Sequence, residues 1–166
     1  MKNIKAIVII IISFIIAIFT TILIINRLRI RTFEQEEVVM TIAIFPGAAT
    51  SNSYLIRITE TGMIRIQLGT RAELMGNLPT ERFFHDISSD RIKRLTDEEM
   101  QTLLGLAEEL RISDYPLRRG FSDGAWEVVF YYYGNIYEMD LLVHREYVTF
   151  LALVEEIIRL GPGRLP

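Results

Sequence analysis

The chain has 166 residues, no cysteine and a formal net charge of −3, a length that suits one domain of ordinary size. Residues 1–33 carry five basic and no acidic residues, whereas residues 34–166 carry thirteen basic and twenty-one acidic ones, a net charge of −8. Because an acidic domain lacks the basic surface that binds phosphate backbones, no nucleic acid partner is expected. The absence of cysteine excludes disulfides, thiolate catalysis and cysteine-ligated zinc.

Residues 6–25 are twenty consecutive uncharged residues, eleven of them isoleucine. At 1.5 Å per residue, a helix of this length matches the hydrocarbon core of a bilayer, about 30 Å thick. The alternative is a cleaved signal peptide, whose apolar region is ~7–15 residues long and ends at a cleavage site of small residues. Large residues fill the corresponding stretch here. We therefore predict a transmembrane signal anchor over residues 6–25, embedded in the lipid bilayer and preceded by a short basic tail, residues 1–5.

Positive charges flank the predicted span almost evenly. Two lysines, Lys2 and Lys5, precede it, and three arginines at positions 27, 29 and 31 follow it, so the positive-inside rule favours neither side strongly. A short head with two lysines is typical of a signal anchor and predicts a cytoplasmic N-terminus with the domain outside the cell membrane. Residues 26–37 are predicted to form a juxtamembrane linker, basic and then acidic, which reaches at most about 40 Å when extended. The domain then stays close to the bilayer.

A soluble domain is predicted over residues 38–161, with a tail at 162–166. Residues 38–45 are rich in β-forming residues and end at Pro46-Gly47, which predicts one strand. A hairpin follows, in which a three-residue loop pairs Ile58 with Ile64 and puts Gly62 in the left-handed conformation that favours glycine. The same register places Arg57 opposite Arg65.

The second predicted hairpin spans residues 125–143 and turns at Gly134-Asn135, a two-residue sequence that hairpins favour. This turn pairs Tyr132 with Tyr137 and Phe130 with Met139 on one apolar face. Residues 70–94 show no clear period, and we expect a short edge strand there, at 83–87 or 91–95.

Two amphipathic helices complete the predicted domain. Thr96 and Glu99 form a capping box, and Leu95 and Met100 occupy the positions of a hydrophobic staple, which sets the start of the first helix. The apolar stripe of the second helix contains Tyr147, Phe150, Leu151, Val154, Ile157 and Ile158. The predicted class is α+β: an N-terminal transmembrane helix, then a two-layer domain with about five antiparallel strands and both helices on one face, in the order β-ββ-α-ββ-α.

Few residues suggest chemistry. His85, Asp86 and Asp90 could supply a metal site or an acid–base pair, but adjacent residues of a strand point apart, so solvated polar residues are the preferred interpretation. No GxSxG, GxGxxG, P-loop or EF-hand sequence occurs. No catalytic residue, metal site or cofactor is therefore predicted.

The segment 118–124 is the best candidate for a small-anion site, because two arginines and a hydroxyl stand beside flexible glycines. The residues concerned are Arg118, Arg119 and Ser122. The alternative is an ordinary glycine-rich connection before a strand.

The sheet face away from the helices carries the most informative polar pattern. Because like charges placed opposite each other destabilise a ladder, we expect Glu127, Glu138 and Asp140 of the second hairpin to neutralise Arg57 and Arg65. The same face would carry the apolar and aromatic residues Leu55, Met63, Val129, Tyr131, Tyr133 and Ile136. Such residues ringed by charges are typical of a surface that binds a protein partner. Coverage of this face by residues 70–94 is the alternative.

These patterns predict a bacterial-type, single-pass membrane protein whose domain is a non-enzymatic binding or accessory module outside the membrane. Two alternatives stay open: a membrane-anchored hydrolase or metal-dependent enzyme centred on His85, Asp86 and Asp90, and a membrane assembly factor that faces the cytoplasm.

Overall fold

The computed structural model describes residues 2–46, 52–72, 83–112, 126–140, 152–153, 155–157 and 159. The chain divides into two compact units, residues 1–35 and residues 36–166. Most predicted elements fall within these ranges, but the anion-binding candidates Arg118, Arg119 and Ser122 lie outside the described residues.

The first unit is one helix, α1, Lys2–Glu34. The helix predicted over residues 6–25 is confirmed, but it is longer at both ends. Residues 26–34, predicted to belong to a linker, continue the helix because they contain no glycine or proline that would end it. The Thr32 hydroxyl donates to the Leu28 carbonyl oxygen at 3.0 Å within this extension. Only residues 35–37 separate the helix from the first strand.

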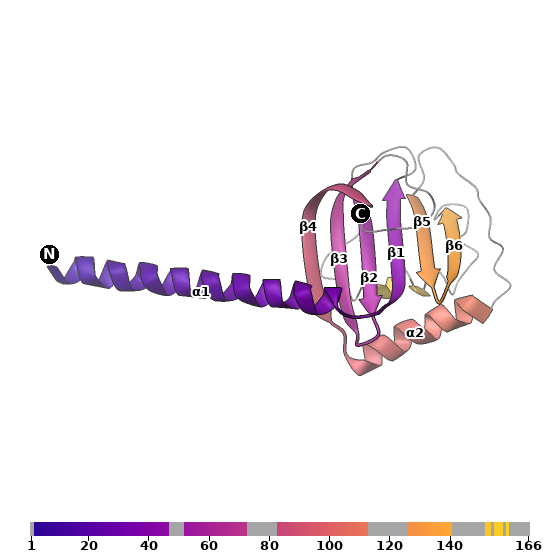
Figure 1. Ribbon diagram of the computed structural model, residues 1–166, viewed down its shortest axis with the longest axis horizontal. Coiled ribbons are helices and arrows are strands. Elements are labelled where there is room, and N and C mark those ends of the chain that lie inside the picture. Colours follow the sequence, from indigo (N-terminus) through magenta and orange to yellow (C-terminus); the bar gives the residue numbers. More distant parts are fainter. Residues whose placement is uncertain are drawn as a thin grey trace. The chain divides into compact units, whose positions relative to one another are not determined.

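The second unit contains an antiparallel sheet of six strands. They are β1 Val38–Pro46, β2 Ser53–Thr59, β3 Met63–Arg71, β4 Phe84–Arg94, β5 Trp126–Tyr132 and β6 Asn135–Asp140. Figure 1 shows their order across the sheet, β4-β3-β2-β1-β5-β6. The predicted α+β class is confirmed, with six strands in place of about five. The chain order is β-ββ-β-α-ββ, followed by helical residues.

Strand β1 lies between the two hairpins and pairs with β2 on one side and β5 on the other. Its side chains from Met40 to Phe45 are all buried. A strand covered on both faces needs apolar or small residues throughout, and this run contains only one hydroxyl, that of Thr41. The predicted sharing of one sheet by both hairpins is confirmed through this strand.

The first hairpin has the predicted register. Ile58 pairs with Ile64, and Arg57 lies directly opposite Arg65. Gly62 has a φ of +81°, and its N–H donates to the Thr59 carbonyl oxygen at 3.0 Å. The alternation of apolar residues on both strands leaves only this loop length, which is why sequence alone determined it.

The predicted register of the second hairpin is wrong by two residues. The turn is Tyr133-Gly134, with φ values of +44° and +81°, so that Phe130, and not Tyr132, pairs with Tyr137. Both φ values are positive, as a type I′ turn requires. A shift of two residues preserves which side chains share a face, so the predicted apolar face survives this correction.

Strand β4 is a continuous edge strand of eleven residues, longer than either short strand predicted within residues 70–94. Its register with β3 shifts between Leu68 and Gly69 and again between Thr70 and Arg71. These bulges place Ser88 and His85 out of the ladder and interrupt the period of two. The interruption explains why the alternation could not be recognised in the sequence.

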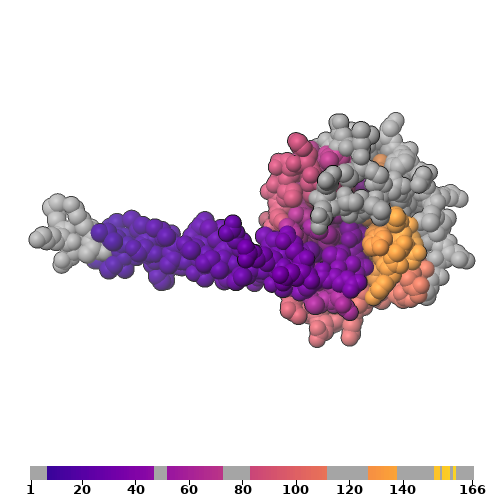
Figure 2. Space-filling model, in the orientation of Figure 1, coloured from indigo at the N-terminus to yellow at the C-terminus, as the bar shows by residue number. Residues whose placement is uncertain are grey.

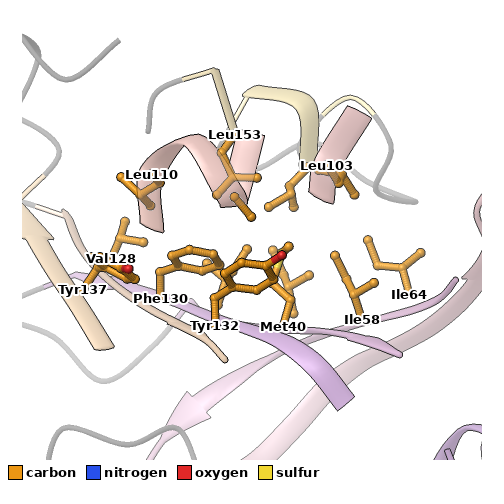
Figure 3. Packing of buried hydrophobic residues seen from close by; sticks show 14 of the residues in the cluster. Met40, Ile58, Ile64, Leu103, Leu110, Val128, Phe130, Tyr132, Tyr137 and Leu153 are labelled. Atoms are coloured by element: carbon orange, nitrogen blue, oxygen red, sulfur yellow. The ribbon is translucent and has the colours of Figure 1, made fainter. Parts of the chain in front are cut away.

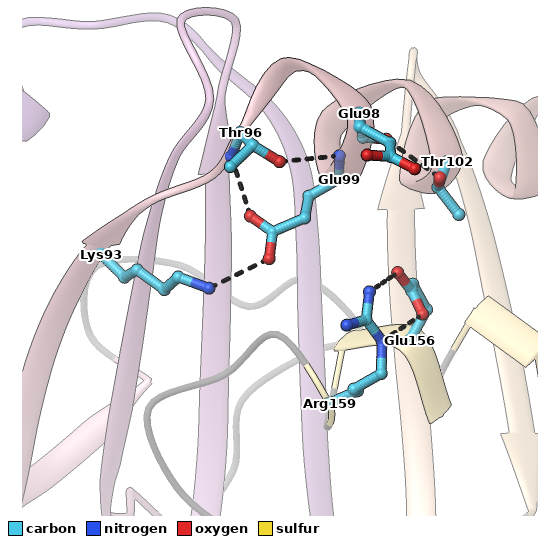
Figure 4. Close-up of polar contacts among 7 residues, drawn as sticks. All are labelled: Lys93, Thr96, Glu98, Glu99, Thr102, Glu156 and Arg159. Carbon is cyan, nitrogen blue, oxygen red and sulfur yellow. Dashed lines mark hydrogen bonds and ion pairs between the residues drawn. The ribbon is translucent and has the colours of Figure 1, made fainter.

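Helix α2, Asp97–Ile112, begins at the predicted capping box (Figure 4). The Thr96 N–H donates to Glu99 Oε2 at 2.8 Å, and the Glu99 N–H donates to Thr96 Oγ1 at 3.2 Å. Lys93 at the end of β4 donates to the other carboxylate oxygen of Glu99 at 3.2 Å. Together these contacts lower the pKa of Glu99, the backbone hydrogen bond contributing most.

Figure 3 shows the main core, where α2 packs on one face of the sheet. Leu103, Ala107 and Leu110 follow one another at spacings of three and four and are buried. Leu153 and Ile157, from the helical residues between 152 and 159, are buried in the same cluster, which confirms two helical segments on one face. Leu153 was not part of the predicted stripe; the predicted positions 147, 150, 151, 154 and 158 lie outside the described residues or side chains.

The domain begins at a polar clasp just before β1, formed by Glu36, Thr59 and Thr61. Glu36 Oε2 accepts a hydrogen bond from Thr59 Oγ1 at 2.6 Å and another from the Thr61 hydroxyl. These two donors lower the pKa of Glu36, and the positive charge of Arg94 acts in the same direction. The Glu60 N–H donates to the Glu37 carbonyl oxygen at 3.0 Å. The start of the domain is thereby fixed to the β2–β3 turn.

Candidate functional site

The first candidate site is the surface of α1. Its large apolar side chains from Ile7 to Leu28 are 44–68% exposed, and Figure 2 shows them along the indigo helix. Consecutive residues advance by 100° around a helix axis, so the exposed run Ile7–Ile12 alone surrounds it. Among the described residues, α1 is the one helix long and apolar enough to cross a membrane, over Ile7–Glu34.

The hydroxyl groups in this apolar helix are satisfied within the helix. Thr20 Oγ1 donates to the Ile16 carbonyl oxygen and Thr21 Oγ1 to the Ala17 carbonyl oxygen, each at 2.8 Å. Bonding of threonine hydroxyls back to the preceding turn reduces the cost of burying them in an apolar medium. A helix with an apolar surface on all sides is unlike a core helix, whose exposed side is polar.

The second candidate site is the sheet face opposite α2, called the second face below. It carries a buried cluster formed by Ala43, Phe45, Leu55, Phe83 and Val129. Phe83, just before β4, packs on Phe45 with ring centroids 6.1 Å apart. The interior of the domain therefore has apolar residues on both sides of the sheet, and much of the second face is closed to solvent.

The residues predicted to bind a partner divide into two groups on this face. Leu55, Met63 and Val129 are buried, at 2%, 7% and 8% exposure, so they present no surface to a partner in this structure. Tyr131 and Ile136 are partly buried, and they lie directly opposite each other on β5 and β6. The expectation of one continuous open surface is corrected accordingly, because apolar residues in a face of this kind are covered by the chain itself.

Tyr133 is the exception. It was expected in a strand on this face, but it occupies the β5–β6 turn and is 67% exposed. Its ring contacts the buried ring of Tyr132 edge-on, with centroids 4.7 Å apart. Burial raises the pKa of the Tyr132 hydroxyl, which lies in the main core. The sequence signal for this turn was present, since Tyr-Gly also places glycine at a position that requires a positive φ, but Gly134-Asn135 fitted the usual preference equally well.

The two opposed arginines of the first hairpin find partners within the same half of the sheet. Arg65 forms a bidentate ion pair with Asp90 of β4. Its Nε donates to Asp90 Oδ1 at 2.9 Å, and its Nη2 donates to Asp90 Oδ2 at 2.6 Å. Gln67 donates to the same carboxylate at 3.2 Å and accepts from Arg57 at 3.0 Å. The predicted neutralisation of Arg65 by the second hairpin is wrong, because the extra strand β4 brings Asp90 alongside. The side chains of Glu138 and Asp140 lie outside the described residues.

Arg71 ends β3 in a different setting. Its guanidinium lies over the Phe45 ring, 4.2 Å from the centroid, and its Nε is buried without a hydrogen-bond partner. Such a cation–π contact stabilises an arginine at the margin of an apolar cluster. It does not by itself make a site for a ligand.

His85, Asp86 and Asp90 all lie on the edge strand β4 and are exposed. Asp90 forms an ion pair with Arg65 and accepts a hydrogen bond from Gln67. Asp86 lies opposite Thr70, beside the second bulge of β3 and β4. Among the residues that the structure describes, no group of three or more His, Cys, Asp or Glu side chains could hold a metal ion. These residues therefore show no arrangement that supports metal-dependent chemistry.

No protein-family model, curated protein or solved structure matches this chain.

Proposed function

We propose that this chain is a single-pass membrane protein in which α1 tethers a small α+β domain that acts as a non-enzymatic binding or accessory module. The observation that carries the proposal is the apolar surface of α1, exposed on every side over Ile7–Ile25. Leaving this surface in water would cost free energy in proportion to its area, at roughly 25 cal/mol per Å². A bilayer removes the whole helix surface from water at once.

The role of a binding or accessory module, in place of an enzyme, is supported by what the polar residues do. Asp90 forms an ion pair with Arg65, and Glu99 caps α2. Glu36 accepts a hydrogen bond from Thr59 at the start of the domain. Each of these carboxylates has a structural partner, and the described residues bring together no constellation suited to acid–base or nucleophilic chemistry. We place the domain on the outer side of the membrane, an orientation supported by the short head that carries Lys2 and Lys5.

Membrane insertion of the full chain tests the proposal directly. The chain is produced in cells, membranes are collected and washed with alkaline carbonate, and the pellet and wash are assayed. We expect the wild type in the pellet. Ile15→Asp places a carboxylate mid-helix at a cost of roughly 2.5–3.5 kcal/mol on the insertion scale and should move part of the chain to the wash.

Ile15→Leu is the matched control, because it changes the shape of the side chain and not its polarity. A wild-type chain recovered from the carbonate wash, or one that lacks residues 1–31 when its N-terminus is sequenced, would contradict the anchor.

A further inference from the structure

Tyr133 stands out among the described residues of the domain. Within residues 36–166, it and Ile87 are the large apolar side chains that the structure describes as exposed, at 67% and 45%. A single exposed apolar residue needs no explanation, but Tyr133 also has a φ of +44°. That conformation is unfavourable for a bulky side chain and is favoured by asparagine or glycine.

The hairpin accounts for the shape of the turn, and the edge-on contact of the Tyr133 ring with Tyr132 leaves Tyr133 67% exposed. The observed register stacks Phe130 on Tyr132 and on Tyr137, with ring centroids 5.9 and 5.7 Å apart, so core packing favours this turn. Asparagine at position 133 would adopt the same backbone with less strain. Strain kept at an exposed position points to a use for the side chain.

The location of Tyr133 indicates what that use is. Strands β1 and β5 are antiparallel, and Tyr132 pairs with Met40 near the start of β1. The β5–β6 turn therefore lies at the same end of the sheet as residue 38, which only three residues separate from the last residue of α1. Ile87 pairs with Gly69 toward the opposite end. If α1 spans a bilayer, the end with Tyr133 is the end of the sheet that the short segment 35–37 joins to the span.

An ion pair that acts on Tyr132 adds no net charge at this corner. Glu108 and Arg111 act electrostatically on the neighbouring Tyr132, and they form an ion pair with each other, so their charges cancel. Tyrosine is suited to the headgroup region because its ring is apolar and its hydroxyl is polar.

We propose that Tyr133 is a lipid contact through which the tethered domain docks on the headgroup region of the bilayer. The inference rests on the proposed function, since without a bilayer at α1 there is no surface for Tyr133 to meet.

The test uses the absence of cysteine from the chain. Three single-cysteine variants of the full chain, Ile15→Cys, Asp86→Cys and Asn135→Cys, are labelled with a nitroxide and reconstituted in phosphatidylcholine vesicles. Collisions with oxygen, which partitions into lipid, and with a water-soluble nickel chelate are measured by electron paramagnetic resonance. Asn135 is exposed beside Tyr133, and Asp86 is exposed toward the other end of the sheet.

We expect lipid-like collisions at residue 15, aqueous collisions at residue 86 and reduced nickel collisions at residue 135. Adding Tyr133→Asn to the Asn135→Cys variant should raise the nickel collision rate several-fold, whereas Tyr133→Trp should keep it low. Because asparagine suits a positive φ, Tyr133→Asn should leave the thermal midpoint of the domain unchanged or higher. This result would separate lipid contact from a structural role of the ring.

Each other outcome has a definite meaning. A residue-15 label in lipid with a fully aqueous residue-135 label would overturn the docking inference and leave the tether standing. An aqueous residue-15 label would overturn the tether itself. Protection of residue 135 in native membranes but not in pure lipid vesicles would identify a protein as the partner, and so would also overturn the lipid contact.

Discussion

At the scale of single residues, Gly69 is fixed by the close approach of two strands. A Cβ at this position would lie 2.1 Å from the carbonyl oxygen of Asp86 and 2.9 Å from the Phe84 ring. The bulge at Ser88, which has no pairing residue on β3, brings the β4 backbone close to Gly69. Backbone cannot rotate out of the way as a flexible side chain can, so only a residue without Cβ fits.

We therefore expect Gly69→Ala to lower the free energy of unfolding by about 1–3 kcal/mol, the usual cost of inserting a methyl group into a filled space. Gly105→Ala is the matched control. Gly105 lies on the exposed side of α2 with no atom within 4 Å of its Cβ position, so alanine should raise the same quantity by about 0.5–1 kcal/mol. Urea unfolding of both variants measures the difference; equal effects would show that the β3–β4 approach is not tight.

The clasp at Glu36 gives a second prediction at this scale, on pH. The carboxylate accepts from two threonine hydroxyls, and its pKa lies below the ordinary 4.5. A carboxyl group whose pKa is lowered on folding stabilises the domain fully above its unfolded pKa, and the contribution is lost as the pH falls through the folded value. At pH 7, Glu36→Gln should lower the free energy of unfolding by about 1 kcal/mol.

The difference between Glu36→Gln and wild type should shrink toward zero as the pH falls below about 4.5. Glu99, Glu108 and Glu156 also have lowered pKa values, but they titrate alike in both proteins and cancel in the comparison. Denaturant unfolding at several pH values gives the curve. A difference that stayed constant down to pH 3 would show that the charge of Glu36 does not contribute.

At the scale of elements, the start of α2 depends on Thr96. Its hydroxyl accepts the Glu99 N–H at 3.2 Å and its own N–H is satisfied by the Glu99 carboxylate. Thr96→Ala removes the side-chain acceptor and should lower the free energy of unfolding by about 1 kcal/mol. Thr102 is a control in the same helix, since its hydroxyl donates only to the carbonyl oxygen of Glu98 one turn earlier. Thr102→Ala should be neutral or slightly stabilising in thermal unfolding, because alanine is the better helix former.

The elements also show what could be predicted from sequence and why. The β2–β3 register followed from alternation on both strands, because one loop length alone kept Ile58 opposite Ile64. The β5–β6 register was wrong because Gly134 can be the first or the second residue of a two-residue turn, and both choices keep the same apolar face. Strand β4 was underestimated because two bulges break its period. Asp90, the partner of Arg65, was not predicted for the same reason, because it lies on β4.

At the scale of the whole molecule, the charge division of the chain bears on orientation. Two lysines precede the uncharged span of residues 6–25 and three arginines follow it, so the positive-inside rule favours neither orientation strongly. Replacing Lys2 and Lys5 by Gln removes both basic side chains before this span and keeps the three arginines after it. We expect this variant to invert, with the domain in the cytoplasm.

A reporter enzyme that is active only outside the cytoplasm, fused after Pro166, measures the orientation. It should be active on the wild type and inactive on the double variant. Replacing Arg29 alone by Gln is the control and should leave the reporter active. Two lysines then precede the span and two arginines follow it. Activity that did not change in the double variant would show that the flanking charges do not decide the orientation.

The exposed edge strand β4 bears on whether neighbouring copies of the protein associate. Proteins confined to a membrane collide far more often than the same number in solution. An exposed edge strand can then pair with the edge strand of a neighbouring copy and form a continuous sheet. Here two bulges and the side chains of Asp86, Arg91 and Arg94 interrupt the edge strand β4. If α1 holds many copies in one membrane, these features of β4 oppose their association through strand pairing.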